Sequence, residues 1–289
     1  MHAHGNRPLL RLEHVSIRDG ASGKLLVHDV GLCLHQGQCL GIVGESGSGK
    51  TLLCRAVMGL LPPALTAEGH AFFEETDMLH AAESRARRVR GVGIGAVLQQ
   101  AATAFDPLYT IGAQLQETLR EKRLLTPKQA RAEAVASLEA VNLPASVLQC
   151  YPHQLSGGML QRCMIALSLA LKSRLVIADE PTTALDAPNQ YAVLQRLAQM
   201  RQRDGVTLIL VSHDLGVVQM LADRVLVLRR GICVEQGSAA EVFNNPRHEY
   251  TRRLVRTRLT LTRAFERLDY FSFEKGKARG GGTAPSGQD

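Results

Sequence analysis

The segment GESGSGKT, Gly44 to Thr51, constrains the fold of this 289-residue chain most strongly. It follows a short apolar run, LGIV, and precedes a helix-like stretch, LLCRAVMGLL. Strand, loop and helix in this order match the pattern GxxxxGK[ST], in which glycines let successive backbone N–H groups point at one phosphate. The segment alone is also compatible with an ordinary glycine-rich turn. The candidate nucleotide-binding residues are Gly44, Glu45, Ser46, Gly47, Ser48, Gly49, Lys50, Thr51 and Leu52.

Two further apolar runs end in polar side chains. LVIADE ends at Asp179 and Glu180, and VTLILVSH ends at His213. Uninterrupted apolar runs of this length are typical of buried parallel strands, and the ligand crevice of such a sheet lies at the carboxyl ends of its strands. A lysine, a metal-directing Asp, an adjacent Glu and a His near a terminal phosphate are the parts needed to hydrolyse a nucleoside triphosphate. A lone His in this position is otherwise a capping or core residue.

A fourth strand-like stretch, GVGIGAVLQ, stops at Gln99, after which the sequence becomes helix-rich. We expect helices over 111–125 and 126–143, the second with Thr126 as N-cap and Pro127 as its first residue. This region predicts a helical subdomain inserted into the sheet between Gln99 and Leu175. Gln99 is then either a functional hinge residue or a simple surface amide.

Ser156, Gly157 and Gly158 precede a predicted helix from Met159 to about Leu171. Glycine is a poor helix former, so its presence here calls for another reason. The start of a helix carries unpaired N–H groups with a partial positive charge, and glycines let an anion approach them closely. We therefore expect a second phosphate-binding helix start, contributed to one nucleotide either by the same chain or by another.

The charge distribution argues against a nucleic-acid partner. Of the formal net charge of +7, a surplus of five comes from nine Lys/Arg against four Asp/Glu after residue 250. The rest is nearly neutral and lacks a nucleic-acid footprint. We interpret the basic end as a helix and a disordered tail, with contact to anionic lipid or to a partner as the alternative.

No apolar run is long enough to span a membrane, and the start of the chain lacks a signal-peptide core. The six cysteines form no CxxC pair, so we expect reduced, mostly buried thiols in a cytoplasmic protein.

GESGSGKT, Gln99, LSGGMLQR, LVIADEPTTALD and SHD, in this order and spacing, resemble the nucleotide-binding subunits of ABC transporters. The resemblance spans nearly the whole chain. It implies an α/β fold: a P-loop NTPase core with a mainly parallel sheet, an N-terminal antiparallel β subdomain and an inserted helical subdomain. The implied division is 1–98 for the β subdomain and first part of the core, 99–171 for the helical subdomain, 172–250 for the second part of the core, and 251–289 for the C-terminal helix and tail.

The resemblance also implies site roles for a Mg²⁺-dependent ATPase. It implies that two subunits face head to tail, with ATP between the Lys50 loop of one and Ser156-Gly157-Gly158 of the other. Glu180 is implied as the general base, and His213 as a contact to the γ-phosphate. Asp179, Thr51 and Gln99 are implied to hold Mg²⁺, and residues 184–186 to line the subunit interface. Many relatives stack adenine on an aromatic residue after the first strand, whereas this chain has Arg18 and Asp19 there.

The stretch VEQGSAAEVFNNPRHEYTRRLV resembles the closing segment of the peptide and nickel importer subfamily. GGMLQR and AFDPLYT are similar to nickel and metal-complex importers, so we expect an ATPase that powers import of nickel or a metal chelate. A dipeptide or oligopeptide importer is the alternative. A non-transport ABC ATPase and a nonhydrolytic module are less favoured, because the chain has one complete set of motifs. The implied partners are a second ATPase subunit (a paralogue or the same chain), two integral-membrane permease subunits and an extracytoplasmic solute-binding protein, at the cytoplasmic face of the inner membrane.

Overall fold

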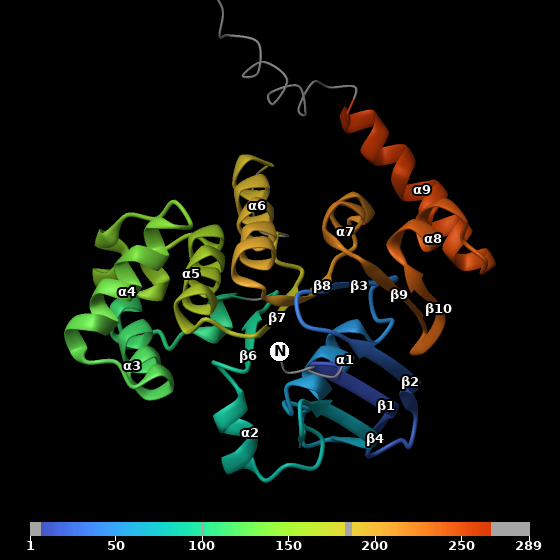
Figure 1. Cartoon of the computed structure of the whole chain (residues 1–289), viewed down its shortest axis with the longest axis horizontal. Coiled ribbons are helices and arrows are strands. Elements are labelled where there is room, and N and C mark those ends of the chain that lie inside the picture. Colours follow the sequence, from blue (N-terminus) through green and yellow to red (C-terminus); the bar gives the residue numbers. More distant parts are fainter. Residues whose placement is uncertain (1–6, 100, 183–186, 267–289) are drawn as a thin grey trace, which may run out of the picture.

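The computed structural model describes residues 7–99, 101–182 and 187–266. Within them, one sheet runs in the order β5-β4-β1-β2-β10-β9-β3-β8-β7-β6. Figure 1 shows helices on both sides of its parallel end and a separate helical group beside β6. The sheet is mixed, and its parallel part carries the segments that the sequence singled out.

The parallel part is built from short buried strands. β3 is Cys39–Val43, β7 is Leu175–Asp179 and β8 is Thr207–Val211, and every residue in these three strands is buried. β3 pairs in parallel with β8, β8 with β7, and β7 with β6 (Ile94–Val97). On the other side of β3 lie β9 (Arg224–Arg229), parallel to β3, and β10 (Ile232–Ser238), antiparallel to β9. The predicted parallel strands are confirmed, and their carboxyl ends share one edge.

Two hydrophobic layers cover this sheet. Alternate residues of β3 point to opposite faces, so that Ile42 packs with one buried cluster and Val43 with the other. α1 (Lys50–Val57) adds Leu53 and Val57 to the first cluster, whereas α6 (Ala187–Asp204) and α7 (Leu215–Leu221) contribute to the second. Figure 1 shows α1 on one side of β3 and β8, and α6 and α7 on the other. The helix after the glycine-rich loop ends earlier than expected, before Gly59, whose φ of +63° is not helical.

The antiparallel end of the sheet comes from the first eighty residues. β1 (Leu10–Asp19) pairs with β2 (Leu25–Leu34) and with β4 (Leu65–Phe73), and β4 pairs with β5 (Thr76–Asp77). A single parallel pairing, Ile232 with His28, joins it to β10. The expected N-terminal antiparallel subdomain is confirmed.

The helical group contains α3 (Ile111–Arg123), α4 (Pro127–Glu139) and α5 (Gly157–Leu171), with short 3₁₀ turns at Ala101–Ala104, Ala145–Gln149 and Pro152–Gln154. Thr126 caps α4 in a capping box with Gln129, and Pro127 is the first helical residue, as predicted. α3 and α4 end sooner than expected. α3 stops because Leu124 adopts a left-handed conformation.

α2 (Glu83–Val89) precedes β6, and α8 (Ala239–Asn244) and α9 (Glu249–Glu266) follow β10. The C-terminal helix is thus present, while the expected tail at 267–289 lies outside the described residues. The subdomain boundaries stay a prediction. Among the described helices, none is both long and apolar enough to cross a membrane.

Candidate functional site

The glycine-rich loop lies between β3 and α1, where Lys50 folds back over it. Lys50 Nζ donates hydrogen bonds to the carbonyl oxygens of Gly44 at 2.9 Å and Glu45 at 2.8 Å. Its side chain is buried, and this desolvation lowers the pKa of Lys50. The negative charges of Glu180 and Asp179 raise that pKa and partly offset the effect. The loop therefore presents a partly desolvated ammonium group, which a phosphate would stabilise in its charged form.

Two glycines of this loop are required by its geometry. A Cβ on Gly44 would overlap the backbone carbonyl oxygen of Leu228 on β9. Gly49, which precedes the first residue of α1, has a φ of +99°, a conformation that L-residues rarely adopt. The loop spacing seen in the sequence thus has a steric basis.

The carboxylate of Asp179 connects the end of β7 to the start of α1. Its Oδ2 accepts a hydrogen bond from Thr51 Oγ1 at 2.8 Å. Its Oδ1 is buried and has no hydrogen-bond partner among the described residues, and the same holds for the hydroxyl of Ser48. Burial raises the pKa of Asp179, partly offset by the Thr51 hydrogen bond. Unpartnered buried oxygens are costly, and a divalent cation would satisfy them, so the residues fit a Mg²⁺ ion.

The next residue, Glu180, points at His213. Its Oε2 lies 2.6 Å from His213 Nδ1, and its backbone N–H donates to the Val211 carbonyl oxygen on β8. Glu180 has a φ of +52°, a strained conformation for this residue type. Strain of this kind often occurs at functional sites, and here contacts with Val211 at the end of β8 and with His213 beyond it hold Glu180 in place.

The structure therefore brings together most of the residues predicted for one site: Lys50, Thr51, Asp179, Glu180 and His213. Gln99 lies at the same edge, because β6 pairs in parallel with β7 and ends two residues before it. Its side chain is exposed, and among the described contacts no hydrogen bond joins it to Thr51 or Asp179.

Ser156, Gly157 and Gly158 lie apart from this group. Ser156 is the N-cap of α5, and its Oγ accepts a hydrogen bond from the Met159 N–H at 3.3 Å. Ser156 and Gly157 are exposed, and the hydrogen bonds described for Ser156 go to Met159 and Leu160 of its own helix. Figure 1 shows α5 in the helical group, away from α1. One chain thus carries two separate candidate phosphate-binding surfaces.

Sequence reasoning missed Tyr250. Its hydroxyl oxygen accepts a hydrogen bond from the Glu45 N–H at 3.1 Å, although 205 positions separate the two residues. Tyr250 is buried, and the Arg229 guanidinium lies 5.0 Å above its ring. The segment HEYTRRLV is informative in the sequence only through its subfamily resemblance, and nothing local in it indicates a contact with the loop.

The region that replaces the usual adenine-stacking aromatic is occupied by paired side chains. Arg18 forms an ion pair with Glu68 on β4. Asp19 Oδ1 accepts from the backbone N–H groups of Ala21 and Ser22, so it caps the β1–β2 turn. The expected interface residues 184–186 lie outside the described residues.

Known proteins resemble this chain over most of its length. The family model described as ABC transporter matches residues 27–183. The chain is 40% identical over 262 residues to the metal-staphylopine import system ATP-binding protein CntD of Staphylococcus aureus (strain NCTC 8325 / PS 47), covering 90% of this chain and 97% of CntD. It is 39% identical to the dipeptide transport ATP-binding protein DppD of Bacillus subtilis (strain 168), covering 84% and 73%.

Among solved structures, the dimeric post-hydrolysis state of the ATP-binding cassette MJ0796 bound to ADP and Pi superposes with a TM-score of 0.72. It shares 27% sequence identity, and the match covers 80% of this chain and 98% of that one. The loop, the strand-end carboxylates and the fold all agree with these likenesses. The chain belongs to the ABC transporter family and is an ATPase of the ATP-binding cassette type.

Proposed function

We propose that this chain hydrolyses ATP at the carboxyl edge of its parallel strands and thereby powers an importer for nickel or a metal chelate. The observation that carries the ATPase site is the convergence of the Lys50 loop with Asp179, Glu180 and His213 at one edge. Little covalent chemistry is needed for phosphoryl transfer to water, so the rate comes from positioning and charge neutralisation.

Phosphate binding rests on the loop from Gly44 to Leu52. The Lys50 ammonium, which now bonds two loop carbonyls, exchanges them for phosphate oxygens when ATP enters. The backbone N–H groups of the loop add neutral donors. Because the ammonium is desolvated, its attraction to the phosphates is stronger than at an exposed lysine.

The divalent ion is proposed to be held by Thr51, Asp179 and Gln99. Bound Mg²⁺ would neutralise charge on the nucleotide phosphates. Asp179 would hold it through the buried oxygen that has no partner among the described residues, and Thr51, which already bonds the other oxygen of that carboxylate, would be a second ligand. Gln99, which follows the strand adjacent to β7, would be the third.

The attacking water is proposed to be held by Glu180. Its carboxylate accepts the water proton, and His213 fixes the orientation of that carboxylate through Nδ1 while its other ring nitrogen faces the γ-phosphate. The left-handed backbone conformation of Glu180 and its contact with His213 support this role.

The second phosphate-binding surface is proposed to serve a partner's nucleotide. The helix α5, which begins at Gly157, lies in the helical group away from α1 (Figure 1), and the similar cassette MJ0796 is a dimer. Two subunits placed head to tail bring each helix start to the other subunit's ATP. The partner is either a second copy or a paralogue.

The transport role is inferred from the relatives and from the sequence segments that resemble importer subunits. CntD, by its name, serves metal-staphylopine import, and DppD serves dipeptide transport. We favour a metal chelate, because CntD matches over nearly the full length of both chains; a dipeptide or oligopeptide is the second candidate.

The remaining proposed partners are two membrane permease subunits and an extracytoplasmic binding protein. With these partners the chain would lie peripherally at the inner face of the cell membrane. We also retain 99–171 as the helical subdomain that faces the permeases.

Uptake in the host tests this proposal. Cells lacking the chain are complemented with the wild type or with Glu180→Gln, and cell-associated nickel, cobalt and zinc are measured by elemental mass spectrometry beside uptake of labelled dipeptides. Metal accumulation restored by the wild type and not by Glu180→Gln supports a metal-chelate importer. Restoration of dipeptide uptake alone selects the second candidate, and restoration by both variants contradicts ATP-driven import.

A further inference from the structure

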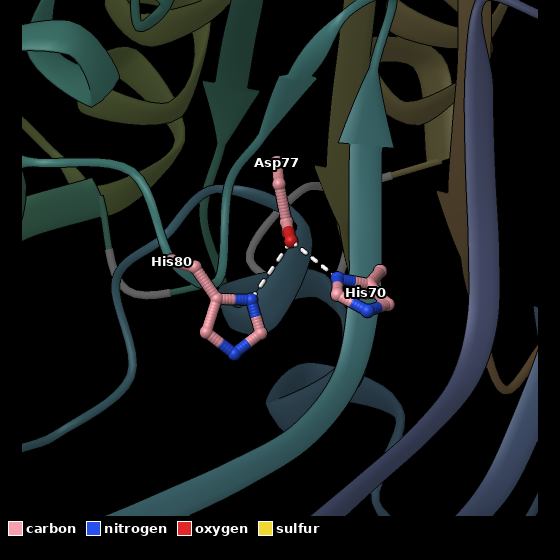
Figure 2. A group of neighbouring side chains, drawn as sticks. All are labelled: His70, Asp77 and His80. Carbon is pink, nitrogen blue, oxygen red and sulfur yellow. Dashed lines mark hydrogen bonds and ion pairs between the residues drawn. The ribbon is translucent and has the colours of Figure 1, made fainter.

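A cluster of two histidines and an aspartate lies in the antiparallel end of the sheet, on the segment between the Lys50 loop and Gln99. His70 is on β4, Asp77 on β5 and His80 in the turn after β5. Each offers one ligand atom, and these atoms all lie within 4.8 Å of one another. Figure 2 shows both imidazole rings turned toward the same carboxylate.

The two carboxylate oxygens of Asp77 have different partners. Its Oδ1 accepts the backbone N–H groups of Ala71 at 3.1 Å and Leu79 at 3.2 Å, which fixes its orientation. Its Oδ2 lies 2.6 Å from His70 Nδ1 and 2.8 Å from His80 Nδ1. Carboxylates that bind metals are commonly oriented by such outer hydrogen bonds.

The hairpin holds the three residues in place before any ion binds. Phe72 pairs with Asp77 and Phe73 with Thr76, so the short β4–β5 turn sets the position of Asp77 relative to His70. The turn after β5 brings His80 back beside Asp77, because the N–H groups of His80 and Ala81 both donate to the Asp77 carbonyl oxygen. The His70 ring also stacks on Phe72, with ring centroids 5.4 Å apart.

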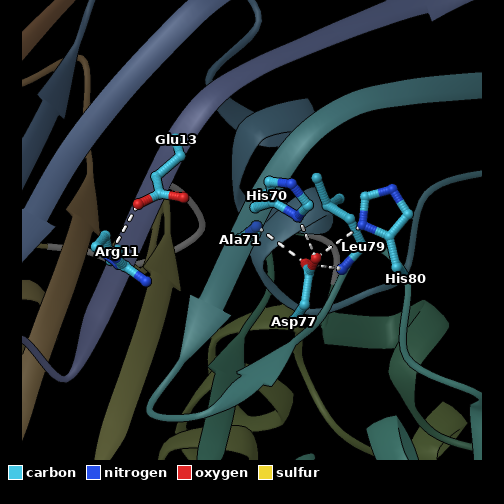
Figure 3. Close-up of polar contacts among 7 residues, drawn as sticks. All are labelled: Arg11, Glu13, His70, Ala71, Asp77, Leu79 and His80. Carbon is cyan, nitrogen blue, oxygen red and sulfur yellow. Dashed lines mark hydrogen bonds and ion pairs between the residues drawn. The ribbon is translucent and has the colours of Figure 1, made fainter.

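A neighbouring carboxylate is excluded from the cluster. Glu13 on β1 is opposite His70 in the sheet, but its Oε1 pairs with Arg11 at 2.7 Å. Figure 3 shows this pair on β1, away from Asp77 and the two histidines. The set is therefore two imidazole nitrogens and one carboxylate oxygen.

We propose that His70, Asp77 and His80 form a binding site for a divalent transition-metal ion, with Zn²⁺ as the probe. Zinc accepts three such protein ligands and keeps water in the fourth position. Donor atoms around one tetrahedral zinc are about 3.3 Å apart, so each Nδ1 would move roughly 0.5 to 0.7 Å away from Asp77 Oδ2. Each ring keeps one proton, which moves from Nδ1 to Nε2 as Nδ1 takes the metal. Mg²⁺ prefers an all-oxygen site and does not compete.

Calorimetry of the full chain with ZnCl₂ tests the site. His2 and His4 near the N-terminus are alternative ligands, so the titrations use a His2→Ala/His4→Ala parent, with excess Mg²⁺ and without nucleotide. We expect one zinc-binding event in this parent. The zinc affinity should fall at least 100-fold, or be lost, in His70→Gln, His80→Gln and Asp77→Asn. Loss of an outer-shell partner, by comparison, typically costs roughly 10- to 100-fold in metal affinity.

His14→Gln is the matched control, because His14 Nδ1 lies 2.7 Å from Asp29 in an exposed pair that has no third ligand among the described residues. It is expected to leave the zinc affinity unchanged. A thermal scan gives the second readout: zinc should raise the unfolding temperature of the parent and of His14→Gln, and not that of His80→Gln. Nucleotide binding checks that each variant is folded. Equal zinc binding in the parent and in all three cluster variants, or none in a folded parent, would overturn the site.

Discussion

The hydroxyl oxygen of Tyr250, at the start of α9, accepts a hydrogen bond from the backbone N–H of Glu45 in the phosphate-binding loop at 3.1 Å. The segment before α9 is itself fixed, because Glu235 on β10 accepts the N–H groups of Arg247 and His248. The Arg229 guanidinium covers the tyrosine ring. Through Tyr250, a positioning residue, the C-terminal region supports the loop that we propose binds phosphate.

Removing this hydroxyl should loosen the loop. In Tyr250→Phe the Glu45 N–H loses its protein partner, at a cost of about 1 kcal/mol in the free energy of unfolding. The same loss destabilises the loop conformation that binds ATP, so we expect the KM for ATP to rise by about fivefold. The change in kcat should be smaller. Steady-state ATPase kinetics and urea unfolding measure the two effects. Tyr109→Phe, at an exposed tyrosine, is the control, and an unchanged KM in Tyr250→Phe contradicts the positioning role.

Replacing the proposed base should separate binding from hydrolysis. Glu180→Gln keeps the shape and the contact with His213 but cannot take a proton from water, so we expect ATP affinity to be retained and turnover to fall by about 100-fold or more. Phosphate release and nucleotide calorimetry provide the two readouts. Glu139→Gln, an exposed glutamate on α4, should behave as wild type. Near-normal turnover in Glu180→Gln removes Glu180 from this role.

Replacing the loop lysine should weaken binding itself. Lys50 is buried against the loop, and a hydrogen bond to a charged phosphate contributes roughly 1.5–3 kcal/mol. Lys50→Ala is therefore expected to weaken ATP binding by about 10- to 100-fold. Calorimetry with ATP measures this, beside Lys128→Ala at an exposed position on α4. Equal affinities in the two variants mean that Lys50 does not contact the nucleotide.

Burial should set the reactivity of the cysteines. It raises the pKa of Cys39 and of Cys163 to about 12 and that of Cys54 well above its ordinary value, whereas Cys33 is exposed. The thiolate is the reactive form, so at pH 8 a raised pKa means less thiolate. We expect iodoacetamide to modify Cys33 first and the three buried thiols only after unfolding. Peptide mass spectrometry monitors each site, and rapid native labelling of Cys54 contradicts its packing role behind the loop.

Local patterns predicted much of the fold and of the cluster of residues proposed as the ATPase site. The runs that lead to Gly44, Asp179 and His213 form buried parallel strands, as predicted. They were predictable because strand burial and glycine spacing depend on a few adjacent residues. The Thr126 cap was also predicted, since a cap depends on the next three residues. α5 begins at Gly157, two residues before its predicted start, with Ser156 as its N-cap.

Contacts that depend on tertiary pairing were not predictable. Tyr250 reaches Glu45 only because β9, β10 and α9 fold back beside β3. His70 joins Asp77 only in one register of the β4–β5 hairpin, and a shift by one residue would turn it to the other face. α3 and α4 end at Arg123 and Glu139, before the predicted ends at 125 and 143. The predicted ends were wrong because backbone conformations such as that of Leu124 depend on how the chain continues into the next element.

A mixing experiment decides whether the two phosphate-binding surfaces belong to different subunits. Ser156→Arg places a bulky cation at the exposed start of α5, and Lys50→Ala disables the loop, so each variant alone should be nearly inactive. In a homodimer, a mixture has one intact loop facing one intact helix start. With random pairing of equal amounts and independent sites, about a quarter of the wild-type turnover should return. Recovery shows that Ser156 acts on the nucleotide of another copy. If turnover stays at the level of the separate variants while the wild type is active alone, both surfaces serve one chain's nucleotide; if the wild type is itself active only with a paralogue, the working dimer is mixed.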